Sequence, residues 1–314
     1  MEQADLIWHN GELVAWEDAK VHVLTHGLHY GTGVFEGERA YDTAHGPGIF
    51  RHHDHLRRLL ASAELYYMPV PYTLEELRTA THELIAANGL AECYIRPIIF
   101  RGYGQMGLNP LDCEVSVSIA AWPWGAYLGE DAAMQGIRAK VASWRRISSD
   151  AMIPHAKASG QYLNSVLAKI EATKAGYEEA ILLDAQGFVS EGTGENIYVV
   201  RDGAILTPPQ TAGILDGISR KSILQIARDL GYEVVERNLA RAELYLADEV
   251  FLSGTAAELV PVTEIDDHRI GPGSAGEVTR ALQAVYADAL HGRDERYREW
   301  LDIVQVPSRT AAAG

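Results

Sequence analysis

Apolar residues in the first part of the chain follow two different spacings. Two short apolar runs in residues 5–16 flank an Asn-Gly dipeptide, which suits a tight turn, and predict a β-hairpin. In residues 51–67 the apolar positions recur every three or four residues, which indicates a helix. A second helix is predicted up to Gly89, because Thr73 and Glu76 have the spacing of a capping box at its start.

Strand patterns follow these helices. Residues 93–100 are rich in β-branched and aromatic side chains, and residues 114–120 alternate apolar with polar or small ones, so we expect the two to pair. The pattern stops at residues 122–131, where glycine and proline interrupt an aromatic stretch, and we place a domain connection there. Beyond it, strands and helices are expected at residues 138–144, 161–175, 179–184, 196–201, 204–207, 219–230, 250–252 and before Trp300. Strands that arrive in groups indicate an α+β fold, with domains at residues 1–121 and 132–314.

Composition and charge narrow the class of function. The 314 residues are 47% apolar and 22% charged, as in soluble globular proteins. The net charge is 27 − 43 = −16 and no segment concentrates Lys or Arg, which argues against a nucleic-acid binder and favours small-molecule chemistry. The chain has only two cysteines, which are expected to be reduced thiols. It has no secretory signal and no run of about 18 apolar residues, so we expect a cytoplasmic protein.

Lys157 is the only formally charged residue between Asp150 and Lys169. If it is buried in this partly apolar stretch, its amine favours the neutral form, and only a neutral amine attacks an aldehyde to form a Schiff base. Taken alone, the segment fits a solvated surface lysine better.

Three further segments are chemically suggestive. Glu191 lies in a glycine-rich stretch between two strands, where a buried carboxylate could pair with a protonated pyridine nitrogen; an acidic surface loop is the plainer interpretation. Residues 216–219 open a helix and residues 253–257 follow an apolar strand, and both offer amides and hydroxyls to an anion; ordinary capping is again the commoner outcome. Together with Lys157, these segments match an aldehyde cofactor that has a pyridine ring and a phosphate.

The sequence resembles the branched-chain-amino-acid aminotransferases of the class IV, or fold type IV, pyridoxal-phosphate family, from about Asp5 to Val304. The resemblance is carried by ordered matches at residues 23–32, Phe35-Glu36-Gly37, Tyr94-Ile95-Arg96-Pro97, residues 124–129, Ser190-Glu191-Gly192, Gly194-Glu195-Asn196, residues 246–251 and residues 253–258. It implies a two-domain α+β fold, with a small N-terminal α/β domain and a larger C-terminal domain that has barrel-like β-structure and binds the cofactor.

The resemblance also implies the reaction and the site. L-leucine, isoleucine and valine would exchange amino groups with 2-oxoglutarate by a ping-pong mechanism, in a homo-oligomer (a dimer or a trimer of dimers). Lys157 would be the Schiff-base lysine and proton carrier, and pyridoxal 5′-phosphate would be held by Lys157, Arg58, Tyr162, Glu191, Ile218, Ser219 and Thr255. The substrate residues would be Tyr30, Phe35, Gly37, Tyr94, Arg96, Trp124, Tyr127, Thr255 and Ala256, with Arg96 serving the distal carboxylate of glutamate.

Some features depart from the family pattern or admit other interpretations. Glu38 stands at a position that is usually apolar, Gly33 replaces a common serine, and the loop 101–108 differs, which leaves the substrate range open to D-amino acids or (R)-amines. Within the family, the nearest alternatives are D-amino-acid transaminase, (R)-amine transaminase and aminodeoxychorismate lyase, and Tyr94-Ile95-Arg96-Pro97 argues against all three. The glycine-rich stretch 31–37 is a weak match to an NAD(P) loop, a non-catalytic protein would be expected to lack Lys157, and two histidine groups at residues 22–29 and 52–55 lack recognised zinc spacing, so no metal is predicted.

Overall fold

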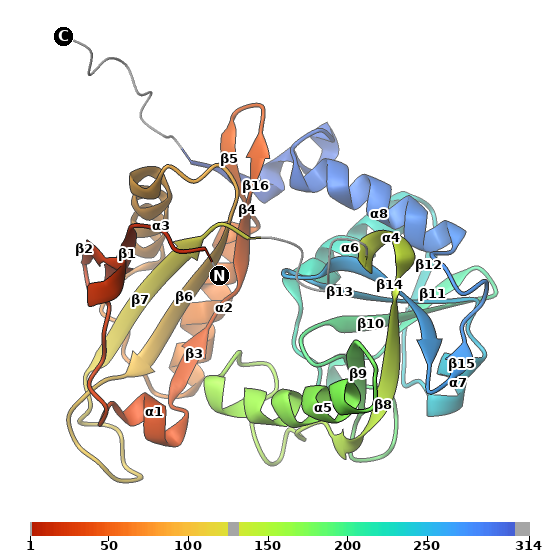
Figure 1. Cartoon of the computed structure of the whole chain (residues 1–314), viewed down its shortest axis with the longest axis horizontal. Coiled ribbons are helices and arrows are strands. Elements are labelled where there is room, and N and C mark those ends of the chain that lie inside the picture. Colours follow the sequence, from red (N-terminus) through yellow and green to blue (C-terminus); the bar gives the residue numbers. More distant parts are fainter. Residues whose placement is uncertain (1, 125–131, 305–314) are drawn as a thin grey trace. The chain divides into compact units, whose positions relative to one another are not determined.

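The computed structural model describes residues 2–124 and 132–304, which form two compact units. The first comprises residues 2–124 and 288–304, and the second comprises residues 132–287. Each unit contains one eight-stranded sheet with helices packed against it, so the predicted α+β class is confirmed (Figure 1). Among the described residues, no helix combines the length and the apolar character needed to cross a membrane.

The first sheet is antiparallel and has the order β16-β5-β4-β6-β7-β1-β2, with β3 paired to β6. Helix α3 packs against β1 and β7, and α2 packs against α3, β3 and β16 (Figure 1). The elements are β1 (Leu6–His9), β2 (Glu12–Ala15), η1 (Trp16–Asp18), α1 (His26–Tyr30), β3 (Gly33–Phe35), β4 (Glu38–Thr43), β5 (Gly46–Phe50), α2 (His52–Leu65), α3 (Leu74–Asn88), β6 (Cys93–Arg101), β7 (Val115–Trp122), η4 (Glu295–Trp300) and β16 (Leu301–Ile303).

The second sheet is mixed and has the order β12-β11-β10-β13-β14-β8-β9, with β15 paired to β14. Strand β8 runs parallel to both of its neighbours, β9 and β14, and α5 covers β8 and β9 while α6 packs on β12 and β13 (Figure 1). The elements are α4 (Ala132–Gln135), β8 (Ile137–Arg145), η2 (Ser159–Gln161), α5 (Tyr162–Lys174), β9 (Glu179–Leu183), β10 (Asn196–Arg201), β11 (Ala204–Thr207), η3 (Gln210–Ala212), α6 (Ile218–Asp229), β12 (Glu233–Glu236), α7 (Arg241–Tyr245), β13 (Glu249–Gly254), β14 (Glu258–Ile265), β15 (His268–Arg269) and α8 (Glu277–Leu290).

Local signals in the sequence have direct counterparts in these elements. The Thr73 side chain accepts a hydrogen bond from the Glu76 amide, Glu76 bonds back to the Thr73 amide, and Gly89 ends α3 with a φ of 62°. Asn10 and Gly11 form the predicted turn, with φ angles of 47° and 99° that glycine and asparagine tolerate best. The predicted pairing of the two strands before the domain connection is confirmed, since β6 and β7 are neighbours throughout their length.

One difference concerns the end of the chain. The sequence-based boundaries assigned every residue after 132 to the second domain, whereas β16 belongs to the first sheet, where Leu301 pairs with Phe50 and Ile303 with Gly48. A three-residue edge strand is too short to show an alternation of its own, and its partner lies some 250 positions earlier. The sequence therefore carried no local signal for this pairing.

Candidate active site

Lys157 lies in a pocket of the second unit, just ahead of α5. Its Nζ donates a hydrogen bond to the Tyr162 hydroxyl at 2.8 Å, and the flanking residues Ala156 and Ala158 are buried. Lys157 itself is half-buried. The pocket is lined by Arg146, Ala156, Lys157, Gln161, Tyr162, Ser165, Glu191, Thr193, Gly194, Glu195, Asn196 and Leu215. The isolated lysine of the sequence thus shares one pocket with the predicted carboxylate, Glu191.

Glu191 is buried and its carboxylate is held from two sides. Oε1 forms an ion pair with Arg146 Nε at 2.9 Å, and Oε2 accepts hydrogen bonds from the Leu215 amide at 3.0 Å and from Asn196 Nδ2 at 3.3 Å. Burial raises the pKa of Glu191, and Arg146, the Leu215 amide and Lys157 oppose that shift. Because burial outweighs these neighbours, a further cationic group in the pocket would stabilise the ionised carboxylate.

The predicted anion cradle at residues 216–219 is the start of α6. Gly217 is the N-cap and Ile218 the first helical residue, so the first amides of the helix are those of Ile218 and Ser219. A Cβ on Gly217 would lie 2.0 Å from Oδ1 of Asn196, and only glycine therefore fits there. Since Asn196 also contacts Glu191, one side chain connects the start of α6 to the buried carboxylate.

The second predicted cradle is the turn that joins β13 to β14. Thr255 and Ala256 lie in this turn, directly after Gly254. A Cβ on Gly254 would lie 3.1 Å from the Gly194 carbonyl oxygen and 3.3 Å from Cγ of Glu195. The backbone before the turn thus closely approaches two residues that line the Lys157 pocket.

Arg58 lies on α2 in the first unit, where a buried carboxylate orients it. Its Nε and one terminal nitrogen bond the two oxygens of Glu36 at 2.6 and 2.8 Å, and His55 Nδ1 lies 2.8 Å from the same carboxylate. Burial alone would raise the pKa of Glu36, but Arg58 and His55 outweigh it and hold that pKa well below its usual range. The predicted phosphate-binding arginine therefore has its guanidinium held by a buried carboxylate.

Aromatic side chains gather around Arg96 on the first sheet. The Arg96 guanidinium lies 4.7 Å from the Phe35 ring centroid and donates to the Tyr94 hydroxyl at 2.9 Å. Tyr94 also packs on Trp122 and Trp124, with centroid distances of 5.2 and 4.5 Å. These contacts bring together several residues that the sequence analysis assigned to the substrate.

Three other residues predicted to bind the substrate are Gly37, Tyr30 and Tyr127. A Cβ on Gly37 would lie 2.0 Å from the Tyr94 hydroxyl oxygen, so glycine is required beside the aromatic group. Tyr30 packs on His26 at the end of α1 and has 43% of its surface exposed. Tyr127 lies outside the described residues.

Comparison with known proteins identifies the family. The model of the amino-transferase class IV family matches residues 33–265. The branched-chain-amino-acid aminotransferase of Escherichia coli K12 is 50% identical over 304 residues, which cover 96% of this chain and 98% of that protein. The chain is a class IV aminotransferase of the branched-chain group.

Solved structures agree with this assignment. The crystal structure of the Escherichia coli branched-chain amino acid aminotransferase matches this aminotransferase with a TM-score of 0.95 and 50% identity, over 96% of this chain and 100% of that one. The branched-chain amino acid aminotransferase of Thermobaculum terrenum, in its holo-form with the cofactor PLP, matches with a TM-score of 0.91 and 38% identity, over 97% and 100%. The predicted family and the predicted fold type IV are confirmed.

Some residues of this aminotransferase were not anticipated from its sequence. Arg146, which pairs with Glu191, follows a strand without any motif of its own, and Glu36 was part of a family match but had no assigned role. Glu38, which departs from the apolar residue usual at this position, is fully buried and bonds His52 Nδ1 at 2.5 Å. Only the three-dimensional pairing reveals these roles, because each partner lies at least 14 positions away.

Glu195 is a second buried carboxyl in the Lys157 pocket. Burial and the neighbouring Glu179 raise its pKa to about 8, although Lys169 and the Gly194 amide oppose the shift, and Glu191 adds to it. Glu179 in turn bonds Lys169 at 2.6 Å and the Thr193 hydroxyl at 2.6 Å. Glu195 is therefore the carboxyl that holds a proton near neutral pH.

We expect Glu195→Gln to make the protein more stable at alkaline pH relative to the unchanged chain. An unfolded glutamate has its ordinary pKa of 4.5, so above that pH the native state binds more protons than the unfolded state. The stability of the unchanged protein should then fall as the pH rises from about 4.5 to about 8, and glutamine, which does not titrate, should remove that fall. Urea unfolding at pH 5, 6.5 and 8 would measure the free energy of unfolding of both proteins. If the difference between their free energies of unfolding stayed constant across these pH values, the prediction would be wrong.

Proposed function

We propose that this aminotransferase exchanges amino groups between L-leucine, L-isoleucine or L-valine and 2-oxoglutarate, with pyridoxal 5′-phosphate as cofactor. The observation that carries the proposal is 50% identity, over 96% of the chain, to a branched-chain-amino-acid aminotransferase. A pocket that holds a lysine amine and a buried carboxylate supports it, because these are the groups that an aldehyde cofactor with a pyridine ring requires.

The residues of the pocket fit this cofactor. When bound, pyridoxal 5′-phosphate supplies a protonated pyridine ring that withdraws negative charge from the substrate α-carbon. Glu191 would hold the proton on the ring nitrogen, and its burial, which disfavours an uncompensated carboxylate, supports this role. Tyr162 would bond the ring hydroxyl, and the amides of Ile218 and Ser219 would receive the phosphate with Thr255 and Arg58.

Lys157 would carry the chemistry. Its Nζ would hold the cofactor through the aldehyde group, and the same amine would accept the proton that leaves the substrate α-carbon. The 2.8 Å contact with the Tyr162 hydroxyl supports this cycle, because it holds the amine in place through a group that can accept or donate a proton. Each amino acid would complete its half of the reaction before the next one binds, which gives ping-pong kinetics.

The substrate residues suit both an apolar and an anionic side chain. Phe35, Tyr94 and Trp124, with Tyr30, Gly37 and Tyr127, would surround the branched side chain, and the turn at Thr255 and Ala256 would present amides to the α-carboxylate. Within the described residues, Nε of Arg96 is buried without a hydrogen-bond partner, which supports a carboxylate of the substrate as the missing acceptor.

We expect Arg96→Met to lower kcat/KM for glutamate on the order of 10²-fold and to change that for leucine much less. Burying the distal carboxylate of glutamate without a cation costs several kcal/mol, whereas leucine has no such group. Half-reactions followed by cofactor absorbance, with one amino acid at a time, would measure each ratio. Tyr94→Phe, which removes only the hydroxyl that Arg96 contacts, is the matched control and should give a smaller loss. An equal loss for both amino acids would assign Arg96 to the α-carboxylate or to the fold.

We also propose that the enzyme is a homo-oligomer of the cytoplasm. Helix α5 exposes an apolar stripe at helical spacing, formed by Leu163, Val166, Leu167 and Ile170, which a second subunit would cover. Both cysteines, Cys93 and Cys113, are buried free thiols, which fits a reducing compartment. Analytical ultracentrifugation would give the subunit number.

The decisive test of the proposed reaction uses purified protein loaded with pyridoxal 5′-phosphate. Leucine alone and glutamate alone should each change its visible spectrum, and the released branched 2-oxo acid or 2-oxoglutarate should match the amount of enzyme. D-alanine and an (R)-amine should have little effect. A spectral change with either of these, and none with leucine, would replace the proposal by an aminotransferase of shifted specificity.

A further inference from the structure

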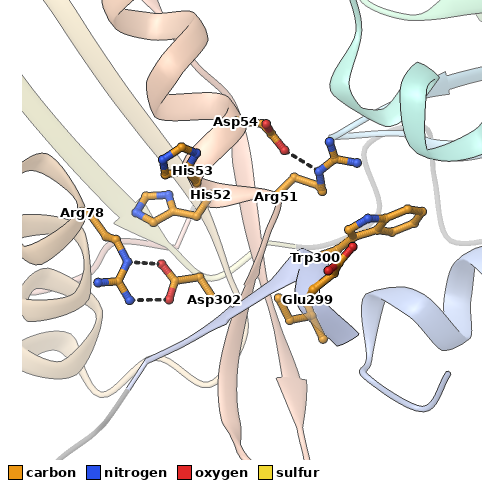
Figure 2. Close-up of a pocket in the computed structure, with 9 residues that line it drawn as sticks. Arg51, His52, His53, Asp54, Arg78, Glu299, Trp300 and Asp302 are labelled. Atoms are coloured by element: carbon orange, nitrogen blue, oxygen red, sulfur yellow. Dashed lines mark hydrogen bonds and ion pairs between the residues drawn. The ribbon is translucent and has the colours of Figure 1, made fainter. Parts of the chain in front are cut away.

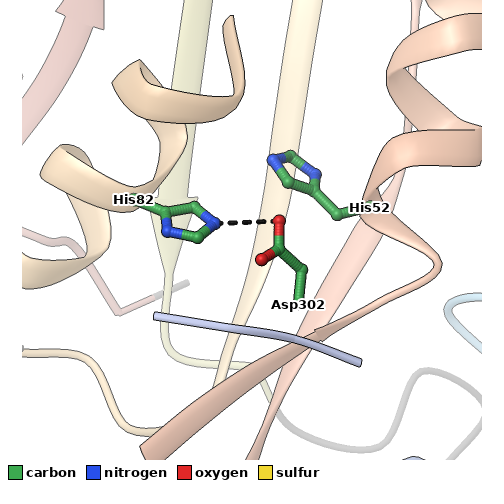
Figure 3. Close-up of side chains that lie close together, drawn as sticks. All are labelled: His52, His82 and Asp302. Carbon is green, nitrogen blue, oxygen red and sulfur yellow. Dashed lines mark hydrogen bonds and ion pairs between the residues drawn. The ribbon is translucent and has the colours of Figure 1, made fainter. Parts of the chain in front are cut away.

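Two histidines and one aspartate from distant parts of the chain meet at one point of the first unit. His52 lies at the start of α2, His82 on α3 and Asp302 on β16, and their side chains lie close together, with His82 directed at Asp302 (Figure 3). His82 Nε2 lies 3.0 Å from Oδ2 of Asp302, and one ligand atom of each residue lies within 4.8 Å of the other two. None of the three has a role in the proposed reaction.

His52 is oriented by a buried carboxylate. Its Nδ1 lies 2.5 Å from Oε2 of Glu38, and both side chains are fully buried. Among the described residues, the other ring nitrogen, Nε2, has no hydrogen-bond partner. A histidine whose one nitrogen is fixed by a carboxylate while the other is unpaired is the arrangement that proteins use to present imidazole to a metal ion.

We propose that His52, His82 and Asp302 bind a divalent cation of the zinc class. Two imidazole nitrogens and one carboxylate oxygen are the ligands that suit Zn²⁺, and three protein ligands leave one coordination position for water. Glu38 fixes the ring of His52 from the second coordination sphere. The proposal gives a common role to Glu38 and His52, which the transamination site does not use.

The pocket beside this cluster gives the cation access. It is lined by Arg51, His52, His53, Asp54, Arg78, Glu299, Trp300, Leu301 and Asp302 (Figure 2). Arg78 bonds both oxygens of Asp302, at 2.6 and 2.7 Å, and would remain on the carboxylate as a second-sphere partner (Figure 2). Binding would therefore exchange the hydrogen bond between His82 and Asp302 for two bonds to the cation.

The geometry requires a small closure of the cluster. Bonds of about 2.0–2.2 Å in a tetrahedral site place neighbouring ligand atoms roughly 3.4 Å apart, whereas the ligand atoms of the three residues lie within 4.8 Å of one another. Rotation of the partly exposed side chain of His82 can supply this movement while Arg78 keeps its contacts with Asp302. The bound cation would link α2 and α3 to the last strand of the sheet and would stabilise the native state by mass action.

Calorimetric titration of the enzyme loaded with its cofactor, with Zn²⁺ as the probe, tests the proposal. We expect about one equivalent to bind per chain, and the midpoint of thermal unfolding to rise with Zn²⁺ concentration. Co²⁺ should bind competitively and give visible absorption bands of a low-symmetry nitrogen and oxygen site, which report coordination independently of activity.

Variants then assign the ligands. His82→Gln, at a partly exposed position where glutamine can still reach Asp302, should abolish the Co²⁺ bands and weaken Zn²⁺ binding at least about tenfold, and Glu38→Gln should weaken it by about 10–100-fold. His53→Gln removes the neighbouring histidine of the same pocket and should leave binding unchanged. Absence of stoichiometric binding, unchanged affinity in His82→Gln, or a loss in His53→Gln as large as in His82→Gln would overturn the proposal.

Discussion

Replacing Lys157 with alanine should lower kcat/KM for leucine and for glutamate alike by about 10⁴-fold or more. The same amine would act as nucleophile and as proton carrier, and each role alone is commonly worth several orders of magnitude. No other lysine lines the pocket, so within its described lining no second amine could take over. The loss should appear in kcat, because the chemical step is affected more than substrate binding.

Coupled assays of 2-oxoglutarate release would measure this loss, and circular dichroism and thermal unfolding would establish that the variant folds. Lys174→Ala is a suitable control, because it removes an exposed lysine from the last turn of the neighbouring helix α5 and should leave the rate unchanged. A small added amine that restores part of the activity of Lys157→Ala would support the proton-carrier role. Turnover near that of the unchanged enzyme would eliminate the assigned mechanism.

Features that depend on nearby residues could be predicted from the sequence. Helix α3 begins and ends where its capping residues indicate, because Thr73, Glu76 and Gly89 act within one turn of the helix ends. The hairpin of β1 and β2 follows in the same way from the turn at Asn10 and Gly11. Such signals act between residues a few positions apart, so they determine the local structure largely independently of tertiary packing.

Features that depend on distant pairing could not be predicted from spacing. Glu38 looked like a departure from an apolar position, and nothing near it in the sequence indicated that its partner would be His52. His82 and Asp302 are separated by 220 positions, and the histidine groups alone did not predict a metal site. Burial of a charged residue becomes intelligible only when the partner that compensates it is known.

The candidate active site could be predicted from the sequence only in part. Taken one segment at a time, the sequence favoured a solvated surface lysine for Lys157 and an acidic surface loop for Glu191. Only the family resemblance assigned both residues to one active site. The structure adds that both residues line one pocket and that Arg146 and Asn196 hold the carboxylate. These two contacts determine what a substitution of Glu191 should do.

Glu191→Gln should lower kcat/KM on the order of 10²–10³-fold for leucine and glutamate equally, while cofactor affinity falls much less. A neutral amide cannot electrostatically hold a proton on the pyridine nitrogen, and losing one such preorganised interaction typically has an effect of this size. We expect the same loss of kcat/KM for both substrates, because the ring nitrogen does not contact the substrate side chain. This pattern distinguishes the variant from Arg96→Met, which should affect glutamate selectively.

The surroundings of Glu191 indicate which controls the experiment needs. Arg146 and the Leu215 amide both donate to the carboxylate, so a glutamine turns its amide group toward one donor and leaves that donor unpaired, at a cost of about 1–3 kcal/mol. Thermal unfolding must therefore accompany the kinetics. Glu195→Gln is the matched substitution, since it removes another buried carboxyl from the same pocket and should change the rate far less near neutral pH, where Glu195 is already protonated.

Glu191 could support electron withdrawal by the pyridine ring or could only place the cofactor. The rate at which the substrate α-proton is removed distinguishes these two roles. Exchange of the leucine α-hydrogen in D₂O, followed by nuclear magnetic resonance, reports that step without requiring product release. We expect the exchange to slow in Glu191→Gln as much as turnover does, because ring-nitrogen protonation stabilises the charge that develops at the α-carbon. If exchange stayed at the rate of the unchanged enzyme while turnover fell, Glu191 would serve cofactor placement and the electron-withdrawing role would belong to another group in the pocket.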